Sequence, residues 1–383
     1  MIVDSIAFGD LHRGNVRPVN PAKLPDEAFD LYSLPAYEGR VPESVLGSQI
    51  GSSKAILEPG DTVLCKIVPH IRRAWVIPEA GSNRQLGSGE WIVLRHKQVD
   101  PNYRRHLLLA DTFHSQFMNT VAGVGGSLMR ARPAQASAIR IPLPPLPEQR
   151  RIATILHQAD YLRVKRRQTL ALLNVQGLAI FHEMFDPSSK SKTAGLLTLS
   201  DARSGGTPSK KRKDHWVGPI PWFSPKDPKA PNLWDSIDHV SAAALSETSI
   251  SILPANTVAT VVRGMILAHS FPIACLRVEG TINQDMKALI PRQIMNPQFL
   301  AHAMRAQTPI ALAALSNAGH GTKRLDSSGL GSIQIPMVSI EVQDEFGRQI
   351  SSIEVLQDSN VSHLRKLDEL FASLQYCAFR GEL

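Results

Sequence analysis

The chain has 383 residues, more than twice the ~150 residues of a typical domain, so we expect several domains. Its composition, 43% hydrophobic and 20% charged, is ordinary for a water-soluble protein. No apolar run approaches the ~20 residues of a membrane span, and no secretory signal is visible. We therefore expect a cytoplasmic protein. The formal net charge of +8 favours polyanionic partners, and the three scattered cysteines, Cys65, Cys275 and Cys377, exclude a disulfide framework or a CxxC metal site and are expected to be buried apolar side chains.

Residues 1–143 predict a mixed α/β domain. Runs rich in valine, isoleucine and threonine predict strands at 62–68 and 91–94, and the pattern after Pro101 predicts one helix over 101–117. Polar and basic segments in this half are candidates for contact with a polyanion. These candidates are Gln49, Ser52, Ser53, Lys54, Lys66, Ser127 and Arg130, with His70, Arg72 and Arg73 beside them.

A long amphipathic helix is predicted within residues 144–186. Prolines from Pro144 to Pro147 enforce an extended lead-in, and Glu148 is favourable near the positive end of a helix. Apolar residues then recur with the spacing of a face that packs on another helix. The stripe includes Ile152, Leu156, Ala159, Leu162, Leu170 and Leu173.

Residues 187–337 predict a second mixed α/β domain. Strands are expected at 257–262, 273–278 and 288–290, and one helix is expected over 297–315. Between Arg203 and Lys213, five cations and no acidic residue accompany a Gly-Gly turn. The N–H groups of such a turn can approach a phosphate while the side chains neutralise it. The alternative is a solvated basic loop without a partner.

A second basic turn, Gly321-Thr322-Lys323-Arg324, is equivalent in the sequence to the segment from Gly126 to Arg130. We therefore expect a polyanion-binding surface in this half. Its candidate residues are Gly205, Gly206, Thr207, Ser209, Lys210, Lys211, Arg212, Lys213, Lys226, Thr322, Lys323 and Arg324.

A second long helix is predicted within residues 338–383. Its stripe includes Phe346, Ile350, Ile353, Leu364, Leu367 and Phe371. Two helices of about 38 residues, each roughly 57 Å long, can bury their stripes against each other as an antiparallel, coiled-coil-like pair. Such a pair would be a rigid spacer. The alternative is that each helix packs only on its own globular half.

The two halves repeat one unit. The motif Ile139-Arg140-Ile141-Pro142 recurs as Ile333-Gln334-Ile335-Pro336, an offset of 194 residues, and Gln149 falls on Gln343 at the same offset. Downstream, Phe181 falls on Phe379 at an offset of 198, so the second helix is longer by about one helical turn and keeps its apolar face. We therefore expect two α/β domains with a pseudo-two-fold relation, separated by the helix pair.

Known catalytic motifs are absent from the sequence. There is no GxGxxG after a strand, no GxxxxGK[ST], no HExxH and no GxSxG. Asp227 and Lys229 resemble half of a metal-dependent nuclease motif, but the only Pro-Asp dipeptide, Pro25-Asp26, lies in the other half of the chain. We expect no catalytic site, no metal and no cofactor in this chain.

Several of these motifs together resemble the specificity (S) subunit of a type I restriction-modification system. Residues 204–209, Ile220-Pro221-Trp222 and 321–324 are similar to those of a target-recognition domain. The run from Ile141 to Ala153 is similar to the family's junction into its central helix, and residues 378–383 to its usual C-terminal ending. Residues 1–60 lack the Gly-Gly-Thr-Pro-Ser opening and are similar to another subgroup of recognition domains, which implies that the two halves read different sequences.

The resemblance implies a non-catalytic DNA-binding subunit that serves in phage defence. The recognition domains, 1–143 and 187–337, would each read one half of a bipartite target. The helices would set the spacing and dock two methyltransferase (M) subunits, with restriction (R) subunits joining through the complex. S-adenosylmethionine, ATP and Mg would be used by those partners. Three other interpretations stay open: an enzyme with an unrecognised site, a coiled-coil scaffold that binds proteins, and a recognition subunit of another phage-defence methylation system.

Overall fold

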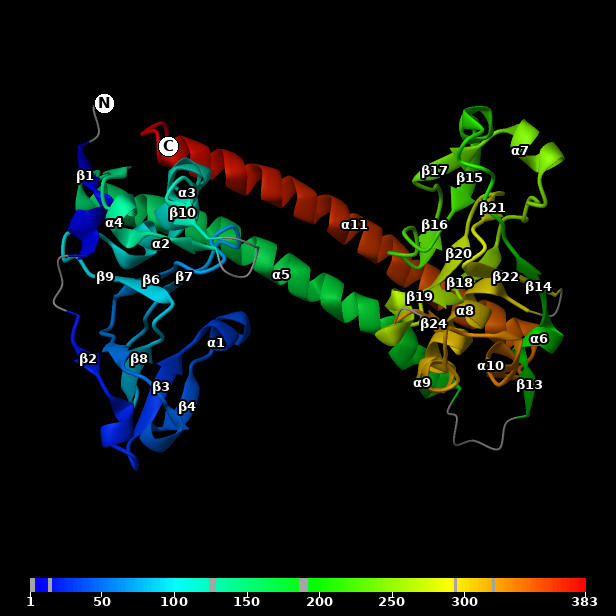
Figure 1. Cartoon of the computed structure of the whole chain (residues 1–383), viewed down its shortest axis with the longest axis horizontal. Coiled ribbons are helices and arrows are strands. Elements are labelled where there is room, and N and C mark those ends of the chain that lie inside the picture. The colour runs from blue at the N-terminus through cyan, green and yellow to red at the C-terminus, as the bar shows by residue number, and fades with distance from the viewer. Residues whose placement is uncertain (1–3, 13–15, 124–128, 186–191, 293–294, 319–320) are drawn as a thin grey trace. The chain divides into compact units, whose positions relative to one another are not determined.

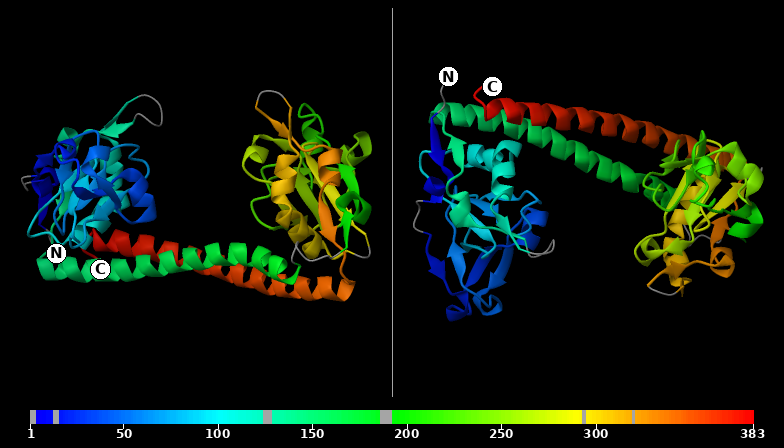
Figure 2. Two further views of the ribbon diagram at one scale, coloured as in Figure 1. Left: turned by 90° about the horizontal axis from the view of Figure 1, so that it is seen from below. Right: turned by 45° about the horizontal axis from the view of Figure 1, so that its top comes forward.

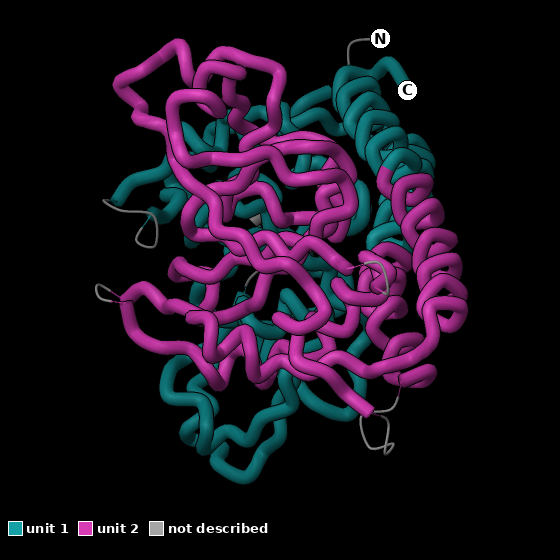
Figure 3. Tube along the Cα trace, turned by 90° about the vertical axis from the view of Figure 1, so that its right-hand side faces the viewer, with its two compact units in different colours: residues 1–167, 362–383 teal, residues 168–361 magenta. Residues whose placement is uncertain are grey.

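The computed structural model describes residues 4–12, 16–123, 129–185, 192–292, 295–318 and 321–383. The chain divides into two compact units, which Figure 3 shows in two colours: unit 1 is Met1–Arg167 with Ser362–Leu383, and unit 2 is Gln168–Val361. Each long helix has residues in both units, so the units differ from the four consecutive segments expected from the sequence. Periodicity marks where a helix begins and ends, but not which globular part each of its ends packs on.

Besides the two-stranded pairs β1-β12 and β10-β11, unit 1 contains two sheets (Figure 1). The larger has the strand order β2-β5-β8-β3-β4 and the smaller has the order β7-β6-β9. All four residues of β6 are buried, and β6 is the central strand of the smaller sheet. The strands of this unit are β1 (Ser5–Ala7), β2 (Pro18–Val19), β3 (Ala28–Tyr32), β4 (Glu43–Leu46), β5 (Lys54–Ile56), β6 (Thr62–Cys65), β7 (Ala74–Val76), β8 (Arg84–Gly87), β9 (Trp91–Leu94), β10 (Val121–Ala122), β11 (Arg130–Ala131) and β12 (Arg140–Pro142).

The single helix expected over 101–117 is two helices, so that prediction is wrong. Ala110 has an extended backbone, with φ −73° and ψ 149°, and separates α2 (Pro101–Leu109) from α3 (Asp111–Met118). Asp100 caps α2 by accepting the N–H groups of Asn102 and Tyr103 at 3.0 Å. The other short helices of unit 1 are α1 (Leu34–Gly39), α4 (Pro133–Ala136), η1 (Phe8–His12), η2 (Pro21–Lys23) and η3 (Gly47–Gln49).

Unit 2 is built around a five-stranded sheet of order β14-β22-β18-β20-β16. Two three-stranded sheets, β17-β15-β21 and β19-β24-β23, and the pair β13-β25 complete it. Its strands are β13 (Thr193–Gly195), β14 (Ser200–Ser204), β15 (Ile220–Phe223), β16 (Asn232–Leu233), β17 (Asp238–Val240), β18 (Thr257–Val261), β19 (Arg263–Gly264), β20 (Ile273–Leu276), β21 (Thr281–Ile282), β22 (Met286–Pro291), β23 (Ser316–Asn317), β24 (Lys323–Arg324) and β25 (Gln334–Pro336).

The helix expected over 297–315 is also divided, into α8 (Pro297–Ala306) and α9 (Thr308–Ala313). Gln307, with φ −92° and ψ 12°, ends the first helix, and Pro309 lies in the first turn of the second, where a missing N–H costs nothing. Unit 2 also contains α6 (Leu196–Leu199), α7 (Ala242–Glu247), α10 (Ser327–Gly331), η5 (Lys213–Trp216) and η6 (Met265–Ala268).

The two long helices, α5 (Leu146–Met184) and α11 (Ile340–Ala378), are each 39 residues long and continuous (Figure 2). The expectation that the second helix is longer by one turn is therefore wrong. Within unit 1, Arg163 of α5 pairs with Asp368 of α11 at 2.6 Å. Within unit 2, the rings of Phe181 and Phe346 lie 5.6 Å apart. No helix among the described residues has the length and apolarity to cross a membrane.

Each long helix packs on both units. Phe379, just after α11, contacts Tyr103 of α2 with ring centroids 5.6 Å apart, and Phe181 of α5 contacts Phe299 of α8 at 5.7 Å. The alternative in which each helix packs only on its own globular half is therefore wrong.

Most of the predicted stripe faces inward. Ile152, Leu156, Ala159, Phe346, Ile350 and Ile353 are buried, and Leu170, Leu173, Leu364, Leu367 and Phe371 are half-buried. Leu162 is 52% exposed, so its predicted place in the packed stripe is wrong. Arg163 lies inward instead, because it pairs with Asp368 and stacks on the ring of Phe371 at 4.1 Å.

The same hydrogen-bonded register occurs in both units. Val63 of β6 lies opposite Val93 of β9, and Val258 of β18 lies opposite Leu289 of β22. β1 pairs with β12 in unit 1, as β13 pairs with β25 in unit 2. The first two pairings are related by offsets of 195 and 196 residues, and β12 and β25 by the offset of 194 residues found in the sequence.

A glutamine anchors the start of each long helix. Gln149 accepts the N–H of Asp100, the cap of α2, at 2.8 Å. Gln343 accepts the N–H of Asn296, the cap of α8, at 2.9 Å. Both side chains are almost completely buried and also donate to a backbone carbonyl just before their own helix, so each fixes the angle between a long helix and a globular part.

The cysteines largely match the expectation. Cys65 and Cys275 are buried and Cys377 is half-buried. Burial raises the pKa of the Cys65 and Cys275 thiols, which keeps them protonated and unreactive.

Candidate nucleic-acid interface

The Gly-Gly turn of unit 2 is held against the protein itself. A Cβ on Gly205 would lie 2.0 Å from the carbonyl oxygen of Ile282 in β21, so only glycine fits there. The N–H of Gly206 donates to the same carbonyl at 2.9 Å. This N–H group is therefore not available to a phosphate, and the predicted role of the glycines is corrected: they bring the loop close to β21.

Two tryptophans position the rest of this loop. Trp222, 4% exposed, donates its indole N–H to the carbonyl of Gly206 at 2.9 Å. Trp216 packs edge-on against Trp222 at 5.0 Å and donates to the carbonyl of Ser209 at 3.3 Å. The loop therefore leaves the sheet along a fixed path.

The cations of the loop differ in availability. Arg212 forms two hydrogen bonds with Asp214, at 2.9 and 2.7 Å, and lies 2.9 Å from Glu247. The Arg212 guanidinium lowers the pKa of Asp214 to about 2. Two acids that follow the basic run therefore already engage Arg212. Lys210, Lys211 and Lys213 are exposed, with no ion pair to any described residue.

Asp227 stabilises a turn through hydrogen bonds to its carboxylate. It is 9% exposed and accepts the N–H of Ser224 at 2.7 Å and the N–H of Ile237 at 2.9 Å. These bonds leave Lys226 exposed beside it. A carboxylate engaged in this way is not a free metal ligand, and no three His, Cys, Asp or Glu residues among those described are grouped to hold a metal ion.

The second basic turn of unit 2 forms β24, which pairs with β19 and β23. Lys323 donates to Asn317 at 2.7 Å, and Thr322 is half-buried. Arg324 lines a hollow of about 110 Å³, and Gln284, another lining residue, contacts Thr207 of the Gly-Gly loop. Ser204, just before the Gly-Gly turn, also lines this hollow.

Three polar residues of this hollow were missed by sequence reasoning: Arg263, Gln284 and Lys287. They lie outside every motif. Only the strand pairings Arg263 with Arg324 and Ser204 with Lys287 bring them together.

In unit 1 the first group of candidates lies at η3 and β5. Lys54 donates to the hydroxyl of Ser52 at 2.6 Å, and its partial burial lowers the pKa of its amine. Gln49 accepts the N–H of Leu46 at 3.1 Å, and Ser53 is exposed. These contacts hold the segment in shape and leave few of its polar groups free.

The second group in unit 1 lies beyond β6, on another sheet. Arg130 pairs with Glu90 at 3.1 Å, and the carbonyl of Lys66 accepts the N–H of Ala131. Ser127 lies outside the described residues. His70 is exposed, whereas Arg72 pairs with Asp111 and Arg73 with Glu38. The candidates of unit 1 are thus divided between two places and are mostly paired.

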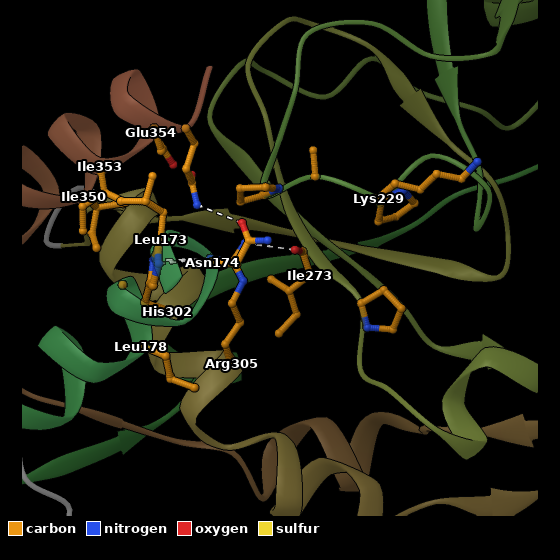
Figure 4. A pocket seen from close by; sticks show the side chains of 16 residues that line it. Leu173, Asn174, Leu178, Lys229, Ile273, His302, Arg305, Ile350, Ile353 and Glu354 are labelled. Carbon is orange, nitrogen blue, oxygen red and sulfur yellow. Dashed lines mark hydrogen bonds between the residues drawn. The ribbon is translucent and has the colours of Figure 1, made fainter. Parts of the chain in front are cut away.

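A cavity of about 360 Å³ in unit 2 lies among α5, α8 and α11 (Figure 4). Arg305 reaches into it and donates to the carbonyl of Ile273 at 3.0 Å, and His302, 8% exposed, bonds the carbonyl of Gln298 at 2.9 Å. Burial lowers the pKa of His302 to about 3, and burial also lowers the pKa of His106 of unit 1 to about 3. Both imidazoles are neutral packing groups at pH 7.

The chain is similar in sequence to known proteins. Residues 37–173 match the family model of the type I restriction modification DNA specificity domain. The specificity subunit of the type I restriction enzyme EcoR124I/EcoR124II of Escherichia coli is 34% identical over 167 residues, which is 43% of this chain and 41% of the relative. The MjaIX specificity subunit of Methanocaldococcus jannaschii is 25% identical over 192 residues, which is 49% of this chain and 42% of the relative.

Two solved structures share the fold over almost the whole chain. A chain from a type I restriction-modification system, in a structure concerned with complex assembly, has a TM-score of 0.59 at 17% identity and covers 99% of this chain and 98% of its own. A type I S subunit from M. genitalium has a TM-score of 0.58 at 13% identity and covers 99% of this chain and 96% of its own. At these identities the likeness is one of fold.

Residues 37–173 are thus similar to the DNA specificity domain of type I restriction-modification systems, and the chain as a whole shares the fold of their specificity subunits. The curated alignments span about two fifths of each relative's length.

Proposed function

We propose that this chain reads a bipartite DNA sequence for a type I restriction-modification complex and has no catalytic activity of its own. The observation that carries the proposal is that unit 2, which lies mostly outside the matched residues 37–173, repeats the strand register of unit 1 and its glutamine anchor. Two copies of one recognition fold in a single chain suit a target in two halves.

The long helices set the spacing between the half-sites and dock two M subunits in this proposal, with R subunits joining through the complex. Apolar side chains left exposed along α5 and α11 support partner docking, because solvent-facing apolar residues gather at interaction surfaces. They include Tyr161, Leu162, Val175, Val355, Leu356 and Tyr376, each more than half exposed. S-adenosylmethionine, ATP and Mg belong to the partner subunits, and the complex acts in the cytoplasm against phage DNA.

The test of this function is the position of methylated adenines in the source genome. Deleting the gene should remove every methylated copy of one bipartite sequence, because the M subunits would lose their sequence reader. Restoring the gene on a plasmid should restore the same sites. Unchanged adenine methylation after deletion would contradict the proposal, and DNA cleavage or methylation by the purified chain alone would favour an enzyme.

Inserting four residues into α5 between Arg166 and Arg167 should change the gap between the half-sites and leave both half-sites intact. Four residues add about 6 Å, close to one turn, so the apolar face returns to its orientation. The readout is the methylated sequence in cells that carry the variant. The matched control replaces Arg166 and Arg167 by alanine without changing the length. A changed half-site in the insertion variant would contradict the spacer role.

Replacing Lys210, Lys211 and Lys213 with alanine should weaken DNA binding whatever the sequence. Each lost phosphate contact should reduce the slope of log K against log salt by about 0.9. Binding of the S–M complex to target and unrelated duplexes, titrated at several salt concentrations, measures the slope. Arg212→Ala is the matched control, because Asp214 and Glu247 already engage that cation. An unchanged slope in the triple variant would remove this loop from the interface.

A further inference from the structure

We infer that the hollow between β14, β19, β22 and β24 of unit 2 is a phosphate seat, which holds one phosphate of the DNA backbone. Its defining residues are Ser204, Arg263, Gln284, Lys287 and Arg324. The inference rests on the proposed function in that it takes DNA as the ligand. It adds a specific contact point and makes that point a property of unit 2 alone.

The charged groups of the seat come from separate strands. Arg263 lies on β19, Lys287 on β22 and Arg324 on β24, and Lys287 donates to the hydroxyl of Ser204 at 2.9 Å. Asp326 also lines the hollow, but its carboxylate accepts the N–H of Gly329 and the hydroxyl of Ser328 at the start of α10. Three cations and one engaged carboxylate leave a net positive lining.

A chain of hydrogen bonds sets the orientation of Gln284. The N–H of Asp285 donates to the amide oxygen of Asn283 at 2.7 Å, so the Asn283 amide nitrogen must be the group that donates to the Thr207 hydroxyl at 2.9 Å. Thr207 then has its own hydrogen left for the amide oxygen of Gln284. The amide nitrogen of Gln284 remains as a donor.

Donors therefore dominate the polar groups of the seat: two guanidinium groups, an ammonium and an amide N–H. A phosphate oxygen only accepts hydrogen bonds, so this lining matches a phosphate. The major-groove edge of guanine also presents only acceptors, and the experiment below distinguishes the two partners. The Thr207 side chain has a positioning role, because it orients Gln284 without facing the hollow.

Among the described residues, the equivalent place in unit 1 lacks this lining. Arg130 bridges to Ile67 in unit 1 as Arg324 pairs with Arg263 in unit 2. Trp91 pairs with Cys65 where Lys287 pairs with Thr260. Two of the three cations of the seat thus have an apolar residue, isoleucine or tryptophan, as their counterpart.

The remaining arginine differs in its partner. Arg130 is paired with Glu90 at 3.1 Å. In unit 2 the equivalent acid, Asp285, lies 3.9 Å from Arg263, and no carboxylate among the described residues is within ion-pair distance of Arg324. At the capping position the charges are reversed, Arg132 in unit 1 and Asp326 in unit 2. The seat in unit 2 and the equivalent place in unit 1 therefore differ in which cations lie together and how they are paired, and not in their total charge.

The matched pair of variants is Arg324→Ala and Arg130→Ala, tested in the complete S–M complex. The probe is a duplex that carries the methylated bipartite sequence, with an unrelated duplex of the same length beside it. Arg324→Ala should lower the affinity for both duplexes by about tenfold and reduce the salt slope by about 0.9. Arg130→Ala should change either affinity by less than about twofold, since Glu90 already engages that arginine.

Neutral phosphates then locate the contact. Duplexes with single methylphosphonates should contain one position that weakens the wild-type complex but not the Arg324→Ala complex, because both changes remove the same interaction. Gln284→Glu places a negative charge in the seat without changing its shape. It should therefore weaken the contact with the phosphate that the methylphosphonates locate. Unchanged thermal melting of each variant shows that the fold is retained.

Three results would overturn the seat. Equal losses for Arg324→Ala and Arg130→Ala would show that unit 2 has no special contact. A loss confined to the target duplex would make Arg324 a base reader. The absence of any methylphosphonate position that Arg324→Ala masks would exclude a phosphate partner. If the wild-type complex bound neither duplex, the proposed function itself would fail. In the three results above the wild-type complex still binds DNA, so the two kinds of failure can be distinguished.

Discussion

Replacing Phe346 with alanine is expected to lower the free energy of unfolding of unit 2 by about 3–5 kcal/mol. Phe346 is completely buried, and its ring lies 5.6 Å from that of Phe181, 5.7 Å from Phe185 and 6.1 Å from Phe299. It stands where α5, α8 and α11 meet, so truncation leaves a cavity lined by three helices that cannot all close in.

Urea unfolding followed by tryptophan fluorescence measures this change, because Trp216, Trp222 and Trp234 report on unit 2. Leu162→Ala is the control. Its side chain is 52% exposed, so its loss should stay within about 0.5 kcal/mol. A loss below about 1 kcal/mol for Phe346→Ala would contradict the assigned packing of α11 on unit 2.

Stability should fall steeply between pH 6.5 and pH 3, because His106 and His302 are held neutral in the folded chain. Burial lowers the pKa of each to about 3, whereas a histidine of the unfolded chain takes up its proton near pH 6.5. Since the folded-state pKa is the lower one, the contribution is complete above about pH 6.5 and is lost as the pH falls toward 3. At pH 5 each histidine should cost about 2 kcal/mol.

The local contacts explain why the proton is resisted. Arg305 approaches both ring nitrogens of His302 at 3.4 Å, so a second positive charge there would be unfavourable. The Nε2 atom of His106 is buried without a hydrogen-bond partner among the described residues, so a proton on it would have no acceptor.

Urea unfolding at pH 7.5 and pH 5 gives the measurement. His106→Gln and His302→Gln should each reduce the difference between the two pH values by about 2 kcal/mol, even where they lower stability at both. His363→Gln, at an exposed position of α11, should leave the difference unchanged. Equal pH dependence in all four proteins would contradict the neutral buried state.

Sequence patterns predicted those parts of the fold that depend on near neighbours. Periodicity located α5 and α11, and β-branched runs located β6, β9, β18 and β20 to within a few residues. The breaks at Ala110 and Gln307 were missed because neither residue is a helix breaker by composition.

In the candidate interface, too, the sequence showed local features but not the contacts between residues far apart in the chain. The basic run 210–213 was visible as a cluster of like charges, yet Arg212 is engaged by Glu247 of α7, 35 positions further along the chain. The Gly-Gly turn was recognised as special, but the reason, the approach to Ile282, depends on the position of β21. Arg263, Gln284 and Lys287 carried no local signal at all.

The sequence by itself determined that the chain contains one unit twice and that each copy ends in a long amphipathic helix, because repetition and periodicity are properties of residue order. Only the tertiary structure decided that the far end of each helix packs on the other copy, and that Arg324 has no carboxylate partner among the described residues whereas Arg130 has one. The physical reason is that burial and charge pairing are set by distances between atoms, and residues far apart in sequence become neighbours only through strand pairing and helix packing.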